Sequence, residues 1–397
     1  MADRSFLDWP FLTDAHRALA DRLESWCAAR LARFGHGEAT VDADCRALVA
    51  ALGEAGWLGI PVPDDGKPLD VRALCLARET LARHHGLADF ALVMQGLGTA
   101  ALAAFGSPAQ RARILPPVRE GRAIAALAMT EPQSGSDVAA VATAAVEDAG
   151  GWVLDGEKTL ISNAGIADHY LVLARSDGPG TRGLSLFVAP ADAPGLTVAE
   201  RQQAIAPHPL GRLAFDGCRL PADALVGPRG GGFKAVMTVL DRFRPSVGAA
   251  ALGFARRALD EALAWSERRP MFGTTLADMP VTQAALADMA LDIDAAALLV
   301  YRAAWRADTV DGRNTREASM AKLFATEAAQ RVVDAAVQMH GGSGVVLGSV
   351  VERLYREVRA LRIYEGASEV QRQIVGAQTR AAFAAAPEGG TGHAHAS

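Results

Sequence analysis

Apolar residues recur at helical spacing over the first part of the chain. From about residue 14 to residue 119, alanine- and leucine-rich runs such as Cys45 to Gly56 and Arg72 to His84 alternate with short Gly/Pro breaks. This pattern predicts an all-α N-terminal domain over residues 1–122.

The pattern changes in the middle of the chain. Between about residues 123 and 226, short apolar runs are bounded by turn residues such as the Asp155-Gly156 pair and the glycine-rich stretch 178–183. We therefore expect a small β-domain over residues 123–229. Its strands are predicted at Trp152-Val153-Leu154, Leu160-Ile161-Ser162, Tyr170-Leu171-Val172-Leu173, Leu184-Ser185-Leu186-Phe187-Val188 and Leu213-Ala214-Phe215.

Long amphipathic patterns return after the Gly230-Gly231-Gly232 linker and predict a four-helix-type bundle over residues 230–384. The last residues, 385–397, have almost no apolar content from Pro387 onward and are predicted to be a disordered tail. The expected fold is mainly α, with a central β-barrel-like domain between an N-terminal helical domain and the bundle.

A Glu365-Gly366 pair interrupts two helical patterns near the C-terminal end. The second pattern restarts at Ser368 with Gln371 three residues later, which predicts a capping box. Glu365 then lies on a connection, and the following glycine tolerates a positive φ, so its carboxylate can be directed into a cavity. Taken alone, the pair also fits an ordinary solvated loop glutamate.

Composition narrows the function classes. The chain has 397 residues, half of them hydrophobic, with a net charge of −5, and its pI is near 6.0, which disfavours a nucleic-acid partner. The four cysteines are widely spaced, predicting a reduced cytoplasmic protein without a metal site. No basic leader or run of eighteen apolar residues occurs, so we expect neither secretion nor a membrane span.

No Gly-x-Gly-x-x-Gly follows a first strand, which argues against a Rossmann enzyme.

Four motifs together resemble those of the acyl-CoA dehydrogenase family, in its order and at its spacing. They are Ala128-Met-Thr-Glu-Pro-Gln-Ser-Gly-Ser-Asp137, Arg269-Pro-Met-Phe-Gly273, Gln338-Met-His-Gly-Gly-Ser-Gly344 and Tyr364-Glu-Gly-Ala-Ser-Glu-Val-Gln371. The resemblance covers residues 48–380 and implies a flavoenzyme. FAD would lie between the β-domain and the bundle, with the acyl thioester on one face of the flavin.

The resemblance places flavin contacts in the β-domain. Thr130 and Ser136 occupy a turn-prone segment whose hydroxyl and N–H groups can meet the flavin, although without the resemblance a capped β-turn would be the preferred explanation. Ile161 and Ser162 fall where the family has a second flavin-contacting strand. The chain departs from the family at Leu160, where tryptophan is usual, so a large aromatic is absent beside the expected flavin position.

Further FAD contacts are implied in the bundle. Arg269 resembles an arginine that reaches the FAD pyrophosphate of a neighbouring subunit, with Phe272 beside it. A guanidinium suits a diphosphate because it is a rigid bidentate donor, but a solvated arginine is the alternative. Gln338 and Gly342 resemble the far wall of that shared site, and Glu369 stands where glutamine is common. The resemblance therefore implies a homo-oligomer, with a tetramer preferred to a dimer.

Substrate contacts are implied near the Glu365 connection. Asp241 and Arg244 resemble residues near the thioester and nucleotide end of CoA, although a charge pair at the start of a helix is the alternative. Ser136, Tyr364 and Gly366 are further candidates for acyl-CoA contacts.

Glu365 is the expected catalytic base. In the family, the glutamate removes the α-proton of an acyl-CoA, its N–H and a flavin ribityl hydroxyl hold the thioester oxygen, and FAD receives the β-hydride. Some branches supply the base from another helix, but that position here is Phe243. An electron-transfer flavoprotein is the expected electron acceptor. Alternatives are a carrier-protein-bound acyl group, oxygen as acceptor, or a catalytically silent assembly partner.

Overall fold

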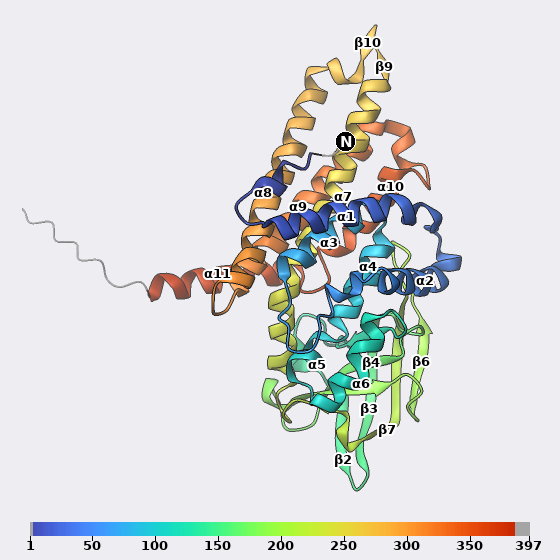
Figure 1. Cartoon of the computed structure of the whole chain (residues 1–397), viewed down its shortest axis with the longest axis vertical. Coiled ribbons are helices and arrows are strands. Elements are labelled where there is room, and N and C mark those ends of the chain that lie inside the picture. The colour runs from blue at the N-terminus through green and yellow to red at the C-terminus, as the bar shows by residue number, and fades with distance from the viewer. Residues whose placement is uncertain (1–2, 386–397) are drawn as a thin grey trace, which may run out of the picture.

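The computed structural model describes residues 3–385. The C-terminal helices form one end of the molecule and a sheet forms the other, with the N-terminal helices packed alongside both (Figure 1). The predicted mainly α fold with a central β-domain is confirmed. Most of the predicted tail, residues 386–397, lies outside the described residues.

The N-terminal domain is built from helices with apolar faces. The helix that starts at Pro108 has a capping box, in which Ser107 Oγ accepts the Gln110 N–H (3.2 Å) and Gln110 Oε1 accepts the Ser107 N–H (2.8 Å). The helices are α1 (Asp14–Arg30), α2 (Val41–Glu54), α3 (Val71–His84), α4 (Gly86–Leu97), α5 (Ala100–Phe105) and α6 (Pro108–Arg119).

The stretch Gly86–Phe105, which contains α4 and α5, is long and apolar enough to cross a membrane by length and composition. In the structure, 78% of its most apolar window is buried inside the protein. Packing against the neighbouring helices and strands accounts for its apolar character.

The middle segment forms one mixed sheet in the order β6-β7-β3-β2-β4-β5-β8, with β1 pairing parallel to β4. Among the described strands, β6 and β8 stand at the two ends of this order, and the predicted central β-domain is confirmed. The strands are β1 (Ala125–Ala128), β2 (Ala144–Asp148), β3 (Gly151–Ser162), β4 (His169–Arg175), β5 (Leu184–Pro190), β6 (Leu196–Arg201), β7 (Leu210–Pro221) and β8 (Leu225–Val226).

Strand β3 differs from the prediction. The Asp155-Gly156 pair does not form a turn between two strands, because Gly151–Ser162 is continuous. Gly156 has φ 143°, the pairing with β7 shifts register there, and a Cβ at Gly156 would lie 2.8 Å from Thr143 Cα. The glycine therefore marks a bulge at a close backbone approach, not a chain reversal.

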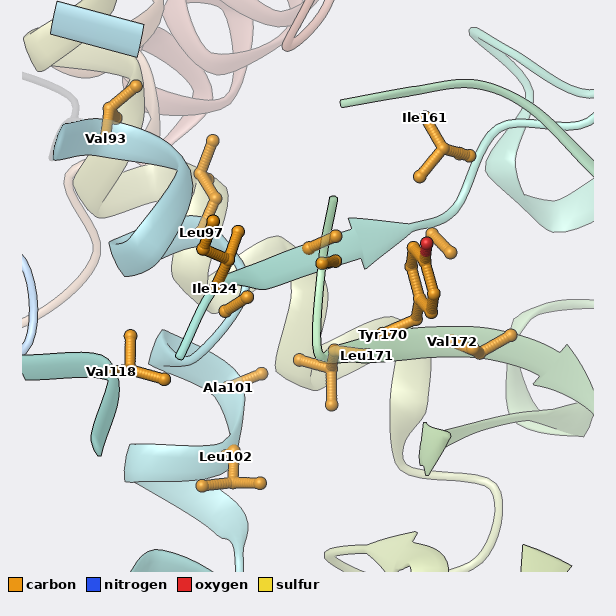
Figure 2. Close-up of a cluster of buried hydrophobic side chains, with 14 of the residues drawn as sticks. Val93, Leu97, Ala101, Leu102, Val118, Ile124, Ile161, Tyr170, Leu171 and Val172 are labelled. Carbon is orange, nitrogen blue, oxygen red and sulfur yellow. The ribbon is translucent and has the colours of Figure 1, made fainter. Parts of the chain in front are cut away.

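A hydrophobic core joins the N-terminal helices to the sheet. Figure 2 shows Leu97 of α4 beside Ile124, with Val93 further along the same helix. Leu171 of β4 belongs to the same core cluster. All four side chains are buried. The β-domain is therefore fixed to the helical domain by apolar burial.

The C-terminal domain contains the longest helices of the described chain. Between α7 and α8, the Arg269 motif forms a two-stranded hairpin that projects from the bundle (Figure 1), with Phe272 92% exposed at its tip. The elements are α7 (Gly232–Arg268), β9 (Pro270–Met271), β10 (Thr274–Thr275), α8 (Pro280–Thr309), α9 (Thr315–His340), α10 (Val350–Leu361) and α11 (Ser368–Ala384).

Helix α3 is held closely against the bundle. Glu79 of α3 accepts hydrogen bonds from Arg256 Nε of α7 (2.6 Å) and from the Tyr301 hydroxyl of α8 (2.5 Å), and all three residues are buried. A Cβ at Gly253 of α7 would lie 2.2 Å from the Glu79 carbonyl oxygen. The two helices can approach this closely because Gly253 has no side chain.

We expect Gly253→Ala to lower the free energy of unfolding by about 1–3 kcal/mol, because α3 and α7 must separate to admit a methyl group. Gly376→Ala in α11 is the control, since nothing lies within 4 Å of its added Cβ. The control should be neutral or stabilised by up to about 1 kcal/mol. Urea unfolding followed by circular dichroism measures both, and equal stabilities would contradict a tight α3–α7 contact.

Candidate active site

Residues 362–367 connect α10 to α11 and are called the Glu365 connection here. They include two successive positive φ angles, 53° at Glu365 and 102° at Gly366. Glutamate rarely adopts such a conformation without support from its surroundings. The supporting donors are Lys322 Nζ and Gln371 Nε2 to the Gly366 carbonyl (2.8 and 3.1 Å) and Arg244 Nε to the Glu365 carbonyl (3.4 Å). Side chains from α7, α9 and α11 therefore fix the backbone that carries Glu365.

The predicted capping box at the start of α11 is wrong. The helix does begin at Ser368, but Ala367 is its N-cap and no side chain caps it. Ser368 Oγ instead donates to Glu327 Oε1 (2.6 Å), and Gln371 turns back to the Gly366 carbonyl. Both side chains serve the connection before the helix.

Both carboxylate oxygens of Glu365 are buried and have no hydrogen-bond partner among the described residues. This burial raises the pKa of Glu365, while the positive charges of Arg78, Lys322 and Arg244 oppose the rise. Buried carboxylates are nearly always hydrogen-bonded, so an unpartnered one requires an explanation. A general base has this arrangement, because its lone pairs must be free for a proton on the substrate.

Arg78 is a member of the site that the sequence did not reveal. Its guanidinium is buried and donates to both carboxylate oxygens of Asp89 on α4 (2.8 Å each) and to Ser246 Oγ on α7 (3.1 Å). The bidentate pair holds one cation rigidly near Glu365. In the sequence, the only signal is a charged residue on an apolar helix face.

Asp241 and Arg244 are brought together next to the Glu365 connection. Arg244 donates to Asp241 Oδ1 (3.1 Å), and the Thr315 hydroxyl donates to Asp241 Oδ2 (2.6 Å). Asp241 also lines a cavity of about 530 Å³ together with Arg242 and Arg313. The exposed cations of this cavity can attract an anionic ligand.

The β-domain brings Thr130 next to strand β3. The Thr159 N–H donates to the Thr130 carbonyl (2.9 Å). A buried ion pair fixes the loop, with Lys158 Nζ 2.7 Å from Glu131 Oε1 and 3.1 Å from the Met129 carbonyl. The structure thus brings together the two segments predicted to contact the flavin.

The side chains on these two segments differ in accessibility. Ile161 is buried in the core (Figure 2), and its carbonyl accepts the Ala164 N–H (3.2 Å). Ser162 is half-buried and Ser136 is exposed. Leu160, which stands where the family has tryptophan, has a side chain that is 57% exposed. Its backbone is in the left-handed region, with φ 56°.

Arg269, Gln338 and Gly342 line a separate cavity of about 750 Å³, to which no residue of the Glu365 connection contributes. Arg269 is exposed and has no carboxylate within 4.0 Å among residues 3–385. Its guanidinium is therefore available to a phosphate group. Glu369 is exposed on the first turn of α11 and faces Arg372 at 3.9 Å.

Family models match nearly the whole chain. They are the N-terminal, middle and C-terminal domains of acyl-CoA dehydrogenase, matched at residues 13–122, 126–218 and 230–379. The chain belongs to the acyl-CoA dehydrogenase family. It is an oxidoreductase that introduces a Cα=Cβ double bond into an acyl-CoA thioester, and the family depends on FAD.

Individual relatives support this assignment. The probable acyl-CoA dehydrogenase FadE25 of Mycobacterium tuberculosis is 36% identical over 332 residues, covering 82% of this chain and 85% of the relative. The bovine mitochondrial short-chain specific acyl-CoA dehydrogenase is 38% identical over 337 residues, covering 83% and 81%. The structure of butyryl-CoA dehydrogenase from Megasphaera elsdenii superposes with a TM-score of 0.84 at 30% identity, covering 93% and 99%.

Lys322 offers a test of the electrostatics around Glu365. Burial lowers the pKa of Lys322 to about 8, so its side chain is charged at neutral pH. Lys322→Met removes a charge that opposes the raised pKa of Glu365, so the acidic limb of the pH profile of kcat/KM should move to higher pH. Steady-state kinetics between pH 5.5 and 9 measures this limb.

Lys322→Arg is the matched control, because it keeps the charge and should leave the acidic limb near its wild-type position. If Lys322→Met lowers kcat/KM equally at every pH without moving the limb, Lys322 has only a structural role.

Proposed function

We propose that Glu365 is the catalytic base of this acyl-CoA dehydrogenase. The observation that carries the proposal is its buried carboxylate, which has no protein partner in residues 3–385 and lies among the cations Arg78, Lys322 and Arg244. The raised pKa suits a group that must accept a proton from carbon near neutral pH. Phe243, at the alternative base position, is fully buried and has no carboxylate.

The backbone N–H of Glu365 also has a role in the proposed reaction. Among the described residues, no backbone acceptor pairs with the Glu365 N–H. A free N–H there can donate to the thioester oxygen and stabilise the negative charge that develops as the α-proton leaves. The donors on the neighbouring carbonyls keep this N–H and the carboxylate in a fixed relative orientation.

FAD fits the residues present. Thr130, Ser136, Ile161, Ser162 and Glu369 would hold its flavin and ribityl portions. The exposed Arg269, with Gln338, Gly342 and Phe272, would hold a diphosphate. When bound, FAD supplies the two-electron sink for the β-hydride. Asp241 and Arg244, with Ser136, Tyr364 and Gly366, would orient the acyl-CoA along the cavity beside α7.

The assembly and partners follow from the same placement. We propose a homo-oligomer, most simply a tetramer, because Arg269 and the exposed Phe272 lie away from the Glu365 connection, where they can reach a neighbouring subunit. The acceptor would be an electron-transfer flavoprotein. The four described cysteines are free and buried, which supports a cytoplasmic location.

The acyl group is proposed to be short, since two of the similar proteins are a short-chain specific and a butyryl-CoA dehydrogenase. Anaerobic bleaching of the bound flavin by a panel of short, long, branched and aryl acyl-CoAs is the direct test. Bleaching by long-chain substrates alone would reject the short-chain proposal.

Glu365→Gln should fold, retain flavin and bind acyl-CoA, because the amide preserves the size of the side chain. Turnover should fall about 100- to 10,000-fold, because a neutral amide does not accept the α-proton. Measurement of kcat in parallel with flavin absorbance separates chemistry from binding. Near-normal turnover would assign the base to another carboxylate.

Arg269→Ala should weaken FAD retention about 10- to 100-fold, since it removes charge-assisted hydrogen bonds to the diphosphate. Flavin content after dialysis and sedimentation of the holoprotein measure this loss. Arg268→Ala, which removes a neighbouring exposed arginine that does not line the cavity, is the control. A flavin-loaded monomer would contradict the shared site.

A further inference from the structure

We propose that a hollow between α1, α3, α7 and α10 binds a small monocarboxylate. This α10 pocket has a volume of about 250 Å³ and is lined by parts of all four helices and by the loop that carries His36. None of its lining residues belongs to the Glu365 connection or to the Arg269 cavity. It is therefore a site separate from the dehydrogenation chemistry.

Two guanidinium groups on facing helices supply the positive charge of the α10 pocket. Arg257 of α7 donates to Glu261 on its own helix (2.8 Å). Arg353 of α10 donates to the Gly348 carbonyl, and within residues 3–385 no carboxylate lies within 4.0 Å of its guanidinium. The pKa of Arg353 is lowered by burial and by the charge of Arg257. An anion between the two would relieve this repulsion.

The other basic groups that line the α10 pocket are either paired with a carboxylate or uncharged at neutral pH. Arg83 is paired with Asp260 (2.8 Å), and His84 Nε2 lies 3.0 Å from Glu24 Oε1. His36 stacks on His85 at 4.2 Å, and burial lowers the pKa of His36 to about 4, so it is uncharged at neutral pH. Burial also lowers the pKa of His85, whose Nε2 faces the Gly35 carbonyl (3.0 Å). Arg353 is thus the lining cation without an acidic partner.

The acidic group on the wall limits the charge of the ligand. Glu357 also lines the α10 pocket, where its carboxylate is 3.1 Å from His208 Nε2. A dianion such as a phosphate ester would approach this carboxylate as well as the arginines. A single negative charge matches the one unpaired guanidinium, so the geometry favours a carboxylate.

The remaining walls and the volume define the rest of the ligand. Leu31, Phe34, Phe254 and Leu354 line the α10 pocket and are buried. A volume of about 250 Å³ lies below the ~300–1,000 Å³ typical of sites for drug-sized ligands. The site therefore suits a short aliphatic body attached to the carboxylate.

Propionate and propionamide form a probe pair of matched shape, and only the first carries charge. Isothermal titration of the FAD-loaded protein in a chloride-free buffer should show saturable binding of propionate and binding at least about tenfold weaker for propionamide. Arg353→Gln should weaken propionate binding by a similar factor. Arg359→Gln, on the same helix but outside the pocket, should not change it.

Several outcomes would overturn the proposal. These are no saturable propionate binding, equal binding of propionamide, or Arg353→Gln binding propionate as tightly as the wild type, which would indicate an adventitious ion only. Should Arg353→Gln lose flavin or its circular dichroism spectrum, Arg257→Gln is tested against the same criteria. Because neither arginine belongs to the proposed active site, loss of the proposed function would not produce these results.

Discussion

Burying the Glu365 carboxylate without a hydrogen bond from residues 3–385 disfavours its ionised form, yet a base must be ionised before it can accept a proton. The charges of Arg78, Lys322 and Arg244 oppose this effect in part, because they stabilise the anion without occupying its lone pairs. Each cation comes from a different helix, namely α3, α9 and α7. The active site therefore depends on the relative placement of three helices from two domains.

The close contact between α3 and α7 matters for the active site because it helps to keep Arg78 near Glu365. Arg78 is fixed by Asp89 and Ser246, so it remains near Glu365 only while α3, α4 and α7 keep their spacing. Gly253 allows that spacing, and the buried Glu79 maintains it through its bonds to α7 and α8. The N-terminal domain consequently contributes to the electrostatics of the base through Arg78.

The sequence indicated some of these features and concealed others for physical reasons. The helical periods, the β-domain and the break at Glu365 were predictable because each depends on residues close in sequence. Arg78 and Lys322 were not, because each looks like an ordinary helix charge until long-range packing buries it. The predicted turn at Gly156 was wrong for a similar reason. Glycine is common in both bulges and turns, and only the pairing with the partner strand distinguishes the two.

The residues that resemble FAD contacts lie in two parts of the structure, and this division constrains the assembly. Thr130 and Ser162 belong to the β-domain segments that meet at β3, whereas Arg269 and Gln338 line a cavity to which the Glu365 connection contributes nothing. Under the proposed function, one FAD must contact both sets of residues, and a second copy of the chain can supply the second set. Arg269 would then bind the FAD of the neighbouring subunit, and cofactor binding and subunit association would stabilise each other by mass action.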